Sequence, residues 1–528
     1  MHKTWNLLPQ LLDDPLEQLF LNRKLKTLKE REGFLSPNLD DFEKELQIPG
    51  IEKTQKRILT AIEKKELIIV YGDYDVDGVC ASAILYKALS TLGAKVLPYI
   101  PHREKEGYGL SNLGLEFARD SGATVVITVD NGIVALEQAD YAKKIGLDLI
   151  ITDHHLPLEK LPDAYSIVHS TKMCGAGVAW CLVRSLISKS LAEDLLQFVG
   201  IATICDMIPL VGIGRAFVKR GLGVLSKTNN LGLIELSIQC GFDLKHVTSY
   251  EIGHIIGPRL NAIGRLEHAI DALRLLCTKD SEKAKNLARL LCDANVTRQK
   301  MTVDALEEAR LKIDKTKKIH ILDSKEWAQG IIGLIAGRIA EEHMRPAIAI
   351  SVGETFSKGS ARSVNGLNIV EVIRSCSDVL IDVGGHPGAA GFSILNEHIE
   401  IFKTRIEKLV ETLPDDVQRV IDIDAKCESQ DISKKLIKDL EKLEPFGFGN
   451  PKPLFVTFGM KASDVRTVGS GKHLKFKADN IDAIAFGMGD LEKDLRSSNL
   501  VDVVYSLEID NYNGFEKIQL KVKDIKLS

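Results

Sequence analysis

The stretch that decides the fold covers residues 67–78 and reads Leu67-Ile68-Ile69-Val70-Tyr71-Gly72-Asp73-Tyr74-Asp75-Val76-Asp77-Gly78. Its apolar start predicts a short buried strand, and the apolar spacing over 81–92 predicts a helix after it. The three carboxylates between them repel one another and lose hydration, which a cation usually offsets. Oxygen ligands at the end of a parallel strand suit Mg2+ or Mn2+. Taken alone, the stretch also fits an Asp-rich turn with hydrated side chains.

The composition limits the class of protein. The chain has 528 residues, 45% hydrophobic and 27% charged, which predicts two to four domains with sizeable cores. No apolar run reaches the ~18 residues of a membrane span, and the first residues lack a signal-peptide pattern. Nine scattered cysteines without a CxxC pair favour reduced thiols and a cytoplasmic location. The net charge of −4 argues only weakly against a nucleic-acid partner, since a basic groove can exist in an acidic protein.

Between about residues 51 and 210, strand-like and helix-like segments alternate. This alternation predicts an α/β fold with a doubly wound parallel sheet, whose sites form at the C-terminal ends of the strands. The expected strands are 67–71, 95–100, 124–129, 148–152 and 166–169.

Polar residues follow the ends of several of these segments. Strand 124–129 is followed by Asp130-Asn131-Gly132, strand 148–152 by Asp153-His154-His155, and the apolar segment 201–205 by Asp206. Each has an ordinary explanation by itself, such as a turn or polar packing. Together with the aspartates after 67–71, they favour a metal centre at one edge of the sheet.

In this order, the four motifs resemble those of the DHH phosphoesterase superfamily. That superfamily includes two-metal phosphoesterases acting on pyrophosphate, short oligonucleotides, cyclic dinucleotides and single-stranded DNA. Three further stretches, 101–110, 257–265 and 384–392, resemble the RecJ family of bacterial 5′→3′ exonucleases specific for single-stranded DNA. The resemblance extends from about residue 30 to the C-terminus.

The resemblance implies that two Mn2+ or Mg2+ ions, about 3.5–4 Å apart, activate a water and stabilise the leaving oxygen. Asp130 would bridge the ions, and the other ligands would divide into Asp73 and Asp75 for one ion and Asp77, His154 and Asp206 for the other. Asp153 would orient its neighbours without binding metal, and His155 would face the substrate phosphate. The expected catalytic residues are Asp75, Asp77, Asp130, His154, His155 and Asp206.

Several other polar residues suit a phosphate-rich substrate. Arg259, Asn261 and Arg265 lie in a segment bounded by Gly and Pro, which predicts a loop of multi-donor groups. Helix capping and surface ion pairs are the ordinary alternative. Gly-rich stretches at 359–363 and 384–386 let a phosphate approach the backbone. By resemblance, the substrate-binding residues are Arg103, Tyr108, His155, Arg259, Asn261, Arg265, Ser360, Arg362 and His386.

The remaining patterns suggest how the chain is divided. Residues 281–313 lack Gly and Pro and predict one amphipathic helix about 45 Å long, which would connect two lobes. Strands near 318–322 and 347–352 predict a second α/β lobe, and those at 454–458, 473–478, 481–486, 501–509 and 515–523 predict an OB-fold barrel. The expected domains are an N-terminal extension (1–50), a DHH catalytic domain with a helical subdomain (51–280), the connecting helix (281–315), a DHHA1 domain (316–414) and a nucleic-acid-binding OB-fold (418–528).

Basic residues gather on two neighbouring strands of the expected barrel. They are Lys461, Arg466, Lys472, His473, Lys475 and Lys477, with Phe476 among them. Charge combined with base stacking binds single strands without sequence preference. A hydrated β face is the ordinary alternative.

The resemblance thus implies a metal-dependent 5′→3′ exonuclease that degrades single-stranded DNA to 5′-mononucleotides in DNA repair and recombination. Single-strand-binding protein and recombination helicases are the candidate protein partners. A phosphodiesterase for short oligonucleotides or cyclic dinucleotides would explain the metal motifs, but not the long helix, the Arg259/Arg265 segment or the barrel. A non-catalytic DNA-bound scaffold would usually have lost metal ligands, whereas all four motifs are intact here.

Overall fold

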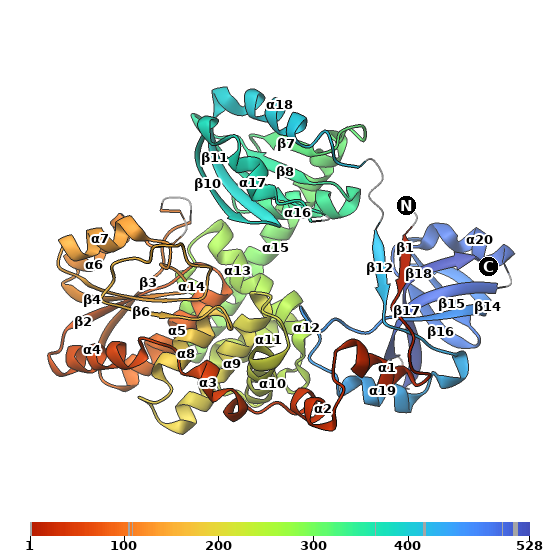
Figure 1. Ribbon diagram of the computed structural model, residues 1–528, viewed down its shortest axis with the longest axis horizontal. Helices are drawn as coiled ribbons and strands as arrows, with labels where there is room; N and C mark the ends of the chain where they lie inside the picture. Colours follow the sequence, from red (N-terminus) through yellow and green to blue (C-terminus); the bar gives the residue numbers. More distant parts are fainter. Residues whose placement is uncertain are drawn as a thin grey trace. The chain divides into compact units, whose positions relative to one another are not determined.

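A computed structural model describes residues 3–103, 106–107, 109–364, 366–414, 419–498, 500–510 and 516–527. The chain divides into two compact units (Figure 1). The larger unit contains Phe42–Ile208 and Phe217–Val417, and the smaller one contains Met1–Asp41, Pro209–Ala216 and Gln418–Ser528. Within the described ranges, none of the helices combines the length and the apolar character that a membrane span requires.

The first sheet of the larger unit is parallel, with the strand order β3-β2-β4-β5-β6, which confirms the predicted α/β fold. Its strands are β2 (Leu67–Tyr71), β3 (Lys95–Tyr99), β4 (Ala123–Val129), β5 (Asp148–Asp153) and β6 (Ser166–His169). The central strands are covered on both faces, so their sequences are continuous apolar runs.

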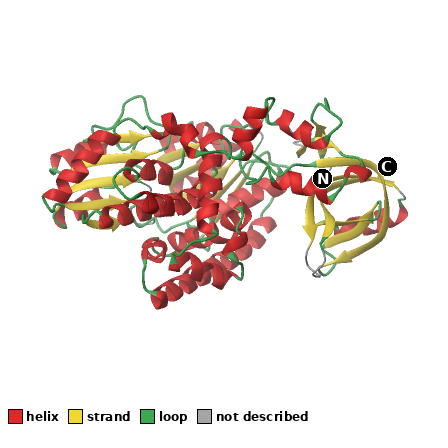
Figure 2. Cartoon of the chain, turned by 90° about the horizontal axis from the view of Figure 1, so that it is seen from below, coloured by secondary structure: helices red, strands yellow, loops and turns green. Residues whose placement is uncertain are grey.

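Helices flank this sheet on both faces (Figure 2). On one face lie α6 (Asn112–Asp120) and α7 (Leu136–Lys144), which share a core with the sheet. On the other lie α4 (Ile51–Glu63), α5 (Val76–Thr91) and α8 (Gly175–Val183), with α9 (Lys189–Cys205) packed against α5. This layered arrangement brings the C-terminal ends of the strands to one edge.

Helix α5 begins at Val76, so the helix expected over 81–92 starts five residues too late. The Asp75 side chain caps the helix by accepting a hydrogen bond from the amide of Gly78 at 3.1 Å. A Cβ atom at position 78 would lie 2.6 Å from Asp73, so only glycine permits this close approach. As a result, Asp77 lies in the first turn of α5.

A helical subdomain follows the sheet. It consists of α10 (Gly212–Leu225), α11 (Leu231–Cys240), α12 (Ser249–Glu251), the π-helix η3 (Ile252–Ile256), α13 (Gly257–Leu266) and α14 (Ile270–Cys277). The loop predicted for Arg259, Asn261 and Arg265 is therefore wrong, since all three lie on α13. Pro258 stands in the first turn, where a helix tolerates the missing amide hydrogen. The predicted long helix is confirmed as α15 (Ser281–Leu311).

The second sheet of the larger unit is mixed, with the order β10-β11-β9-β8-β7. Its strands are β7 (His320–Ser324), β8 (Ala347–Ser351), β9 (Phe356–Arg362), β10 (Leu380–His386) and β11 (Ala389–Leu395), and its helices are α16 (Ile332–His343), α17 (Ile369–Arg374) and α18 (Ile399–Leu409). The Gly-rich stretches belong to β9 and β10. Gly359 lets the Phe392 ring pack on the backbone, because a Cβ there would lie 2.1 Å from that ring.

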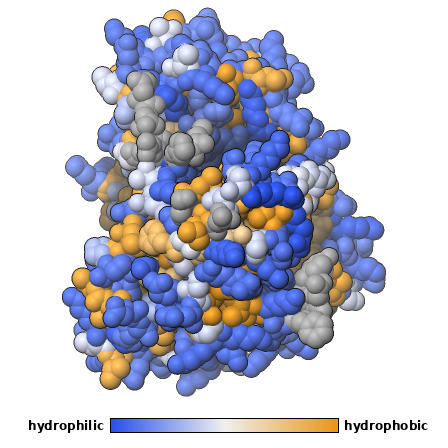
Figure 3. Space-filling model, turned by 90° about the vertical axis from the view of Figure 1, so that its right-hand side faces the viewer, coloured by the Kyte–Doolittle hydropathy of each residue, from blue (hydrophilic) through white to orange (hydrophobic). Residues whose placement is uncertain are grey.

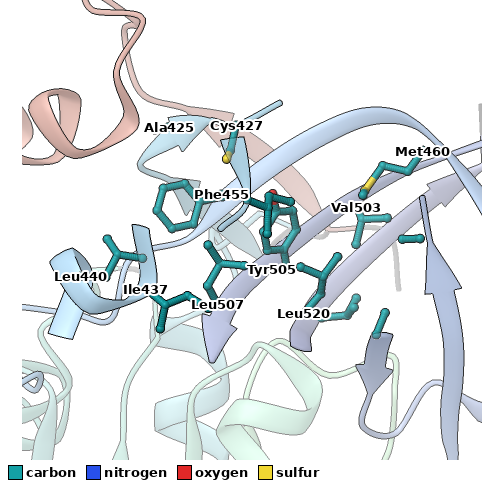
Figure 4. Packing of buried hydrophobic residues seen from close by; sticks show 14 of the residues in the cluster. Ala425, Cys427, Ile437, Leu440, Phe455, Met460, Val503, Tyr505, Leu507 and Leu520 are labelled. Atoms are coloured by element: carbon teal, nitrogen blue, oxygen red, sulfur yellow. The ribbon is translucent and has the colours of Figure 1, made fainter. Parts of the chain in front are cut away.

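The smaller unit contains a closed barrel with the order β13-β14-β15-β16-β18-β17, in which β17 also pairs with β14. The strands of the barrel are β13 (Ala425–Lys426), β14 (Phe455–Val468), β15 (His473–Ala478), β16 (Ile481–Ala485), β17 (Leu500–Asp510) and β18 (Lys517–Leu527). The preceding strand, β12 (Val420–Ile423), lies outside the barrel. Figure 4 shows its core, in which Phe455 and Tyr505 lie among aliphatic side chains. This confirms the predicted OB-type barrel.

The N-terminal residues belong to this smaller unit. Strand β1 (Thr4–Leu7) pairs in parallel with β12, and the barrel core includes residues of α1 (Pro15–Asn22) and α2 (Leu28–Leu35). The buried guanidinium of Arg215 donates hydrogen bonds to the carbonyl oxygens of Phe34, Glu444 and Pro445. The sequence alone gave no sign that the N-terminal residues pack with the barrel.

On the face seen in Figure 3, hydrophilic residues predominate and hydrophobic ones form separate patches.

Truncation of Leu19 tests whether the N-terminal helix α1 packs in the barrel core. Its side chain is fully buried in the barrel core, so Leu19→Ala should lower the free energy of unfolding of the smaller unit by ~2–5 kcal/mol. Leu28→Ala is the matched control, because Leu28 is 76% exposed and should cost less than about 0.5 kcal/mol. Urea unfolding followed by circular dichroism measures both. Equal effects of the two substitutions would mean that α1 does not pack in the barrel core.

Candidate metal centre and substrate site

The side chains of the four sequence motifs meet at the C-terminal edge of the first sheet. The first motif follows β2 and extends into the first turn of α5, and Asp130 follows β4. The third motif lies at the end of β5, and Asp206 follows the last residue of α9. Three groups have ligand atoms within 4.8 Å of one another: Asp73, Asp75 and Asp130; Asp77, His154 and Asp206; and Asp130, His154 and His155. Asp130 and His154 each belong to two groups, so the ligands form one continuous cluster.

The centre of the cluster is His154. Its Nε2 atom lies 3.1 Å from Asp130 Oδ1, 3.5 Å from Asp206 Oδ2 and 3.6 Å from Asp77 Oδ2. Nevertheless, His154 Nε2, Asp130 Oδ1 and Asp73 Oδ1 are buried without a hydrogen-bond partner in the described part of the chain. Each buried polar atom left unpaired costs about 1–3 kcal/mol. Such atoms, aimed at one another, fit a bound cation.

The protonation equilibria of the carboxylates support the same conclusion. Burial, followed by the neighbouring Asp75, raises the pKa of Asp77 to about 7. Burial, followed by the charges of Asp77 and Asp75, raises the pKa of Asp206 to about 8. The pKa values of Asp73 and Asp130 are also well above the ordinary range, chiefly through burial. A divalent cation would offset this repulsion, and burial lowers the pKa of His154 to about 4, so its imidazole is neutral and able to bind metal.

Asp153 is engaged with protein groups. Its carboxylate accepts hydrogen bonds from the amides of Ile133, His154 and His155 at 2.9, 2.7 and 3.2 Å, and its Oδ1 lies 2.8 Å from Nδ1 of His155. Burial opposes ionisation of Asp153, but the hydrogen bond with His155 lowers its pKa overall. In turn, although burial acts to lower it, this contact raises the pKa of His155 to about 9. The geometry suits Asp153 to orienting His155.

The N-terminus of helix α8 holds one of the aspartates in place. Its first amides, those of Gly175 and Ala176, donate to the two oxygens of Asp77 at 2.6 and 2.7 Å. A Cβ at position 175 would lie 2.7 Å from Asp130, so glycine is required there. Asp130 itself has a left-handed backbone, with φ of 63°. Gly175 and Ala176 were not predicted from the sequence, where their only signal is a run of small residues after Cys174.

Guanidinium groups gather beside this acidic cluster. Burial, followed by the charges of Arg103, Arg298 and Arg362, lowers the pKa of Arg265 to about 10. Arg103 lies 4.8 Å from the centre of the Tyr74 ring, and Arg362 donates to Ser360 Oγ at 3.1 Å. Such mutually repelling cations suit a polyanionic ligand.

The other predicted substrate residues are placed differently. Asn261 accepts a hydrogen bond from the amide of Val76 at 3.1 Å, so it holds the start of α5. Arg259 donates to the carbonyl of Ile255 in the preceding π-helix η3, and Arg265 donates to the carbonyl of Gly330. His386 is exposed on β10 and close enough to His154 to lower its pKa further. The predicted Tyr108 lies outside the described residues.

The long helix α15 contributes an unpredicted member of the basic group. Arg298 donates to the side chain of the buried Asn295 at 2.8 Å, and its Nε atom is buried without a partner among the described residues. The signal that could have found it is a polar pair on the helix, at positions 295 and 298, close to the apolar stripe.

One prediction about the barrel is wrong. Phe476 is 1% exposed and lies in the barrel core, so its ring is not on the face of Lys475 and Lys477. Side chains alternate along β15, which places neighbours of the two lysines inside. The exposed ring nearby is Phe486, which contacts His473 with ring centres 5.2 Å apart and lies beneath Lys521.

The arrangement of the larger unit is that of a DHH-type phosphoesterase. Family models match the DHH family N-terminal domain at residues 67–203, the DHHA1 domain at 316–415 and the RecJ OB domain at 423–524. The single-stranded-DNA-specific exonuclease RecJ of Bacillus subtilis is 34% identical, over 100% of this chain and 70% of that protein. The chain belongs to the RecJ family.

Solved structures agree with this assignment. The structure of Thermus thermophilus RecJ in complex with Mn2+ matches 99% of this chain and 80% of its own, with a TM-score of 0.88 and 29% identity. The structure of the same RecJ with Mg2+ matches 99% and 78%, with a TM-score of 0.80 and 28% identity. The buried, unpaired ligand atoms of the present cluster fit these two ions.

Substitution of Asp206 tests the cluster. Because its pKa in the folded state lies above the unfolded value of ~3.9, its negative charge destabilises the fold increasingly as the pH rises above that value. Without metal, Asp206→Asn should therefore raise the melting temperature by a few degrees at pH 8. Addition of Mn2+ should stabilise the wild type clearly and the variant much less.

The control for this substitution is Asp163→Asn, whose exposed carboxylate pairs with Lys143 on the surface. Differential scanning fluorimetry in EDTA and in Mn2+ measures all three proteins. A control that behaves like Asp206→Asn, or an Asp206 variant that keeps the full response to Mn2+, would contradict the cluster as a metal centre.

Proposed function

We propose that this chain is a divalent-metal-dependent exonuclease that degrades single-stranded DNA from its 5′ end to 5′-mononucleotides. The observation that carries the proposal is the juxtaposition of two groups of opposite charge. Buried carboxylates and half-buried imidazoles fit Mn2+ or Mg2+, and half-buried guanidinium groups next to them fit phosphates. A phosphodiester between the two groups would meet both metal ions and cationic donors.

The metal ligands in this proposal are Asp73, Asp75, Asp77, Asp130, His154 and Asp206. When bound, the ions activate a water and stabilise the leaving oxygen. Asp153 holds the His155 imidazole in place, and the raised pKa of His155 keeps that imidazole protonated at neutral pH. His155 can therefore donate a hydrogen bond to a phosphate oxygen.

The substrate phosphates would be bound on the other side by Arg103, Arg265, Ser360, Arg362 and His386, with Arg259 and Tyr108 as further members. Ser360 and Arg362 lie on the same strand, β9, and hydrogen-bond to one another, so their donors are held together. Asn261 acts indirectly, because it fixes the start of the helix that carries Asp77.

The barrel would supply a separate surface for binding single-stranded DNA. Lys475 and Lys477 point outward along β15, and Phe486 with Lys521 supplies an exposed ring and a cation for stacking. We also infer a role in DNA repair and recombination in the cytoplasm, together with single-strand-binding protein and recombination helicases. The resemblance to the RecJ family supports these inferences.

Hydrolysis of 5′-labelled single-stranded DNA tests the function. In Mn2+, the enzyme should release labelled mononucleotide from the single strand, and EDTA or annealing into a blunt duplex should prevent it. Asp130→Ala should reduce the rate by about a hundredfold or more, because Asp130 belongs to two ligand groups.

The control for Asp130→Ala is again Asp163→Asn, which should retain full activity. Hydrolysis of a dinucleotide but not of a long strand would favour a small-nucleotide phosphodiesterase. Retained DNA binding without any hydrolysis would favour a non-catalytic scaffold.

Phe486→Ala tests the barrel. The Phe486 side chain is 52% exposed, and loss of one stacked base should weaken the affinity for single-stranded DNA by ~1–3 kcal/mol. The matched control is Phe356→Ala, because Phe356 is 48% exposed and also lies beneath a lysine, but belongs to β9 of the other unit. Fluorescence anisotropy with a labelled oligonucleotide measures both. Equal losses, or no loss for Phe486→Ala, would rule out this stacking site.

A further inference from the structure

A carboxylate outside the metal centre ties together the segment between β3 and α6. Glu106 Oε1 accepts a hydrogen bond from the amide of His102 at 2.8 Å, and the amide of Glu106 donates to the carbonyl of His102 at 2.9 Å. Glu106 Oε2 accepts from the hydroxyl groups of Tyr99 at 2.7 Å and Ser111 at 2.9 Å. Tyr99 is the last residue of β3, and Ser111 caps α6. One side chain thus joins the strand, the turn after it and the next helix.

Tyr71, the last residue of β2, extends this network toward the metal centre. Its hydroxyl donates to the carbonyl of Gly109 at 3.2 Å and accepts from the amide of Ser111 at 3.2 Å. Its ring centre lies 5.1 Å from that of Tyr99. A Cβ atom at Gly114 would lie 2.4 Å from the Tyr71 ring, so α6 can approach the ring only with glycine there. The network therefore also holds the strand that leads into the first metal motif.

The hydrogen bonds to Glu106 all have the same direction. Each of its three partners donates, which suits an ionised carboxylate, because that group can only accept. Burial, followed by the hydrogen bond to Glu106, raises the pKa of Tyr99, so its hydroxyl stays protonated and able to donate at neutral pH. Hydrogen bonds to a charged group are stronger than those between neutral groups. Removal of this carboxylate would release three donors together.

The turn that Glu106 closes carries Arg103, one of the residues proposed to bind substrate phosphates. The guanidinium carbon of Arg103 lies 4.8 Å from the centre of the Tyr74 ring. Tyr74 stands in the chain between Asp73 and Asp75 of the candidate metal centre. A guanidinium held on an aromatic ring has a defined plane, which suits bidentate binding of a phosphate. The position of Arg103 over this ring therefore depends on the conformation of the turn.

We propose that Glu106 is a positioning residue for the substrate: by closing the turn, it holds the Arg103 guanidinium over Tyr74, where it binds a phosphate other than the reacting one. Glu106 itself touches neither the metal ions nor the DNA. Such a phosphate is bound equally before and during the reaction, so displacement of Arg103 raises KM and leaves kcat nearly unchanged. The role of Arg103 rests on the proposed function, whereas the hydrogen bonds of Glu106 do not.

The test measures kcat and KM for hydrolysis of 5′-phosphorylated single-stranded DNA in Mn2+. Glu106→Ala should raise KM by about 10- to 100-fold and keep kcat within about threefold of the wild type. Glu106→Gln should raise KM less, because glutamine keeps the side-chain volume and one acceptor oxygen. Tyr99→Phe should also have a smaller effect, since it removes one hydroxyl and keeps the ring.

The matched control is Glu116→Ala. Glu116 is half-buried like Glu106 and also accepts a hydrogen bond from a tyrosine hydroxyl at 2.7 Å, that of Tyr141. It lies within α6, and its tyrosine partner lies on α7, so neither belongs to the turn that carries Arg103. Glu116→Ala should leave KM unchanged. A rise in KM equal to that of Glu106→Ala would mean that the effect is not specific to the turn.

A double substitution separates positioning from a general loss of structure. In the Arg103→Ala background, Glu106→Ala should raise KM by less than about twofold, because the two substitutions remove the same contact. Glu106→Ala should also keep the full stabilisation by Mn2+ in differential scanning fluorimetry. Additive effects on KM, an unchanged KM in Glu106→Ala or a weakened response to Mn2+ would overturn the positioning role. A wild type that hydrolyses no DNA would refute the proposed function and, with it, the role of Arg103.

Discussion

The repulsion among carboxylates buried at one edge of the first sheet is the constraint on which the rest of this structure depends. The protein offsets part of it with neutral and partly positive groups, since two amides of α8 hold Asp77 and three backbone amides hold Asp153. Unpaired atoms of Asp73, Asp130 and His154 are left over. Divalent cations would complete the arrangement, because they would satisfy these atoms and their charges together.

A group of arginines lies beside the acidic cluster and gives the site two sides of opposite charge. Arg103, Arg265 and Arg362 repel one another on one side, and the carboxylates repel one another on the other. Metal ions bound to the carboxylates would reverse the charge of the acidic side, so that both sides of the site would attract a phosphate. A chain with a net charge of −4 can therefore suit a DNA substrate, because bound metal ions would neutralise the carboxylates of the candidate metal site.

Local patterns in the sequence were sufficient for the strands and the four motifs, because buried parallel strands are apolar runs and their ends carry the ligands. They failed where a single local interaction outweighs periodicity. The Asp75 cap starts α5 early, and Pro258 is tolerated in the first turn of α13. The inward position of Phe476 follows from alternation along β15 and was predictable. The pairing of β1 with β12, by contrast, joins segments more than 400 residues apart and leaves no local signal.

The most direct test of whether the buried carboxylates bind two metal ions is anomalous diffraction at the manganese edge from crystals grown with Mn2+. Two anomalous peaks are expected within the cluster, both in contact with Asp130, with Asp73 and Asp75 on one and Asp77, His154 and Asp206 on the other. Ordered side chains with no manganese among them, or manganese bound only elsewhere, would contradict it. In that case, the buried carboxylates would have to be stabilised by protonation.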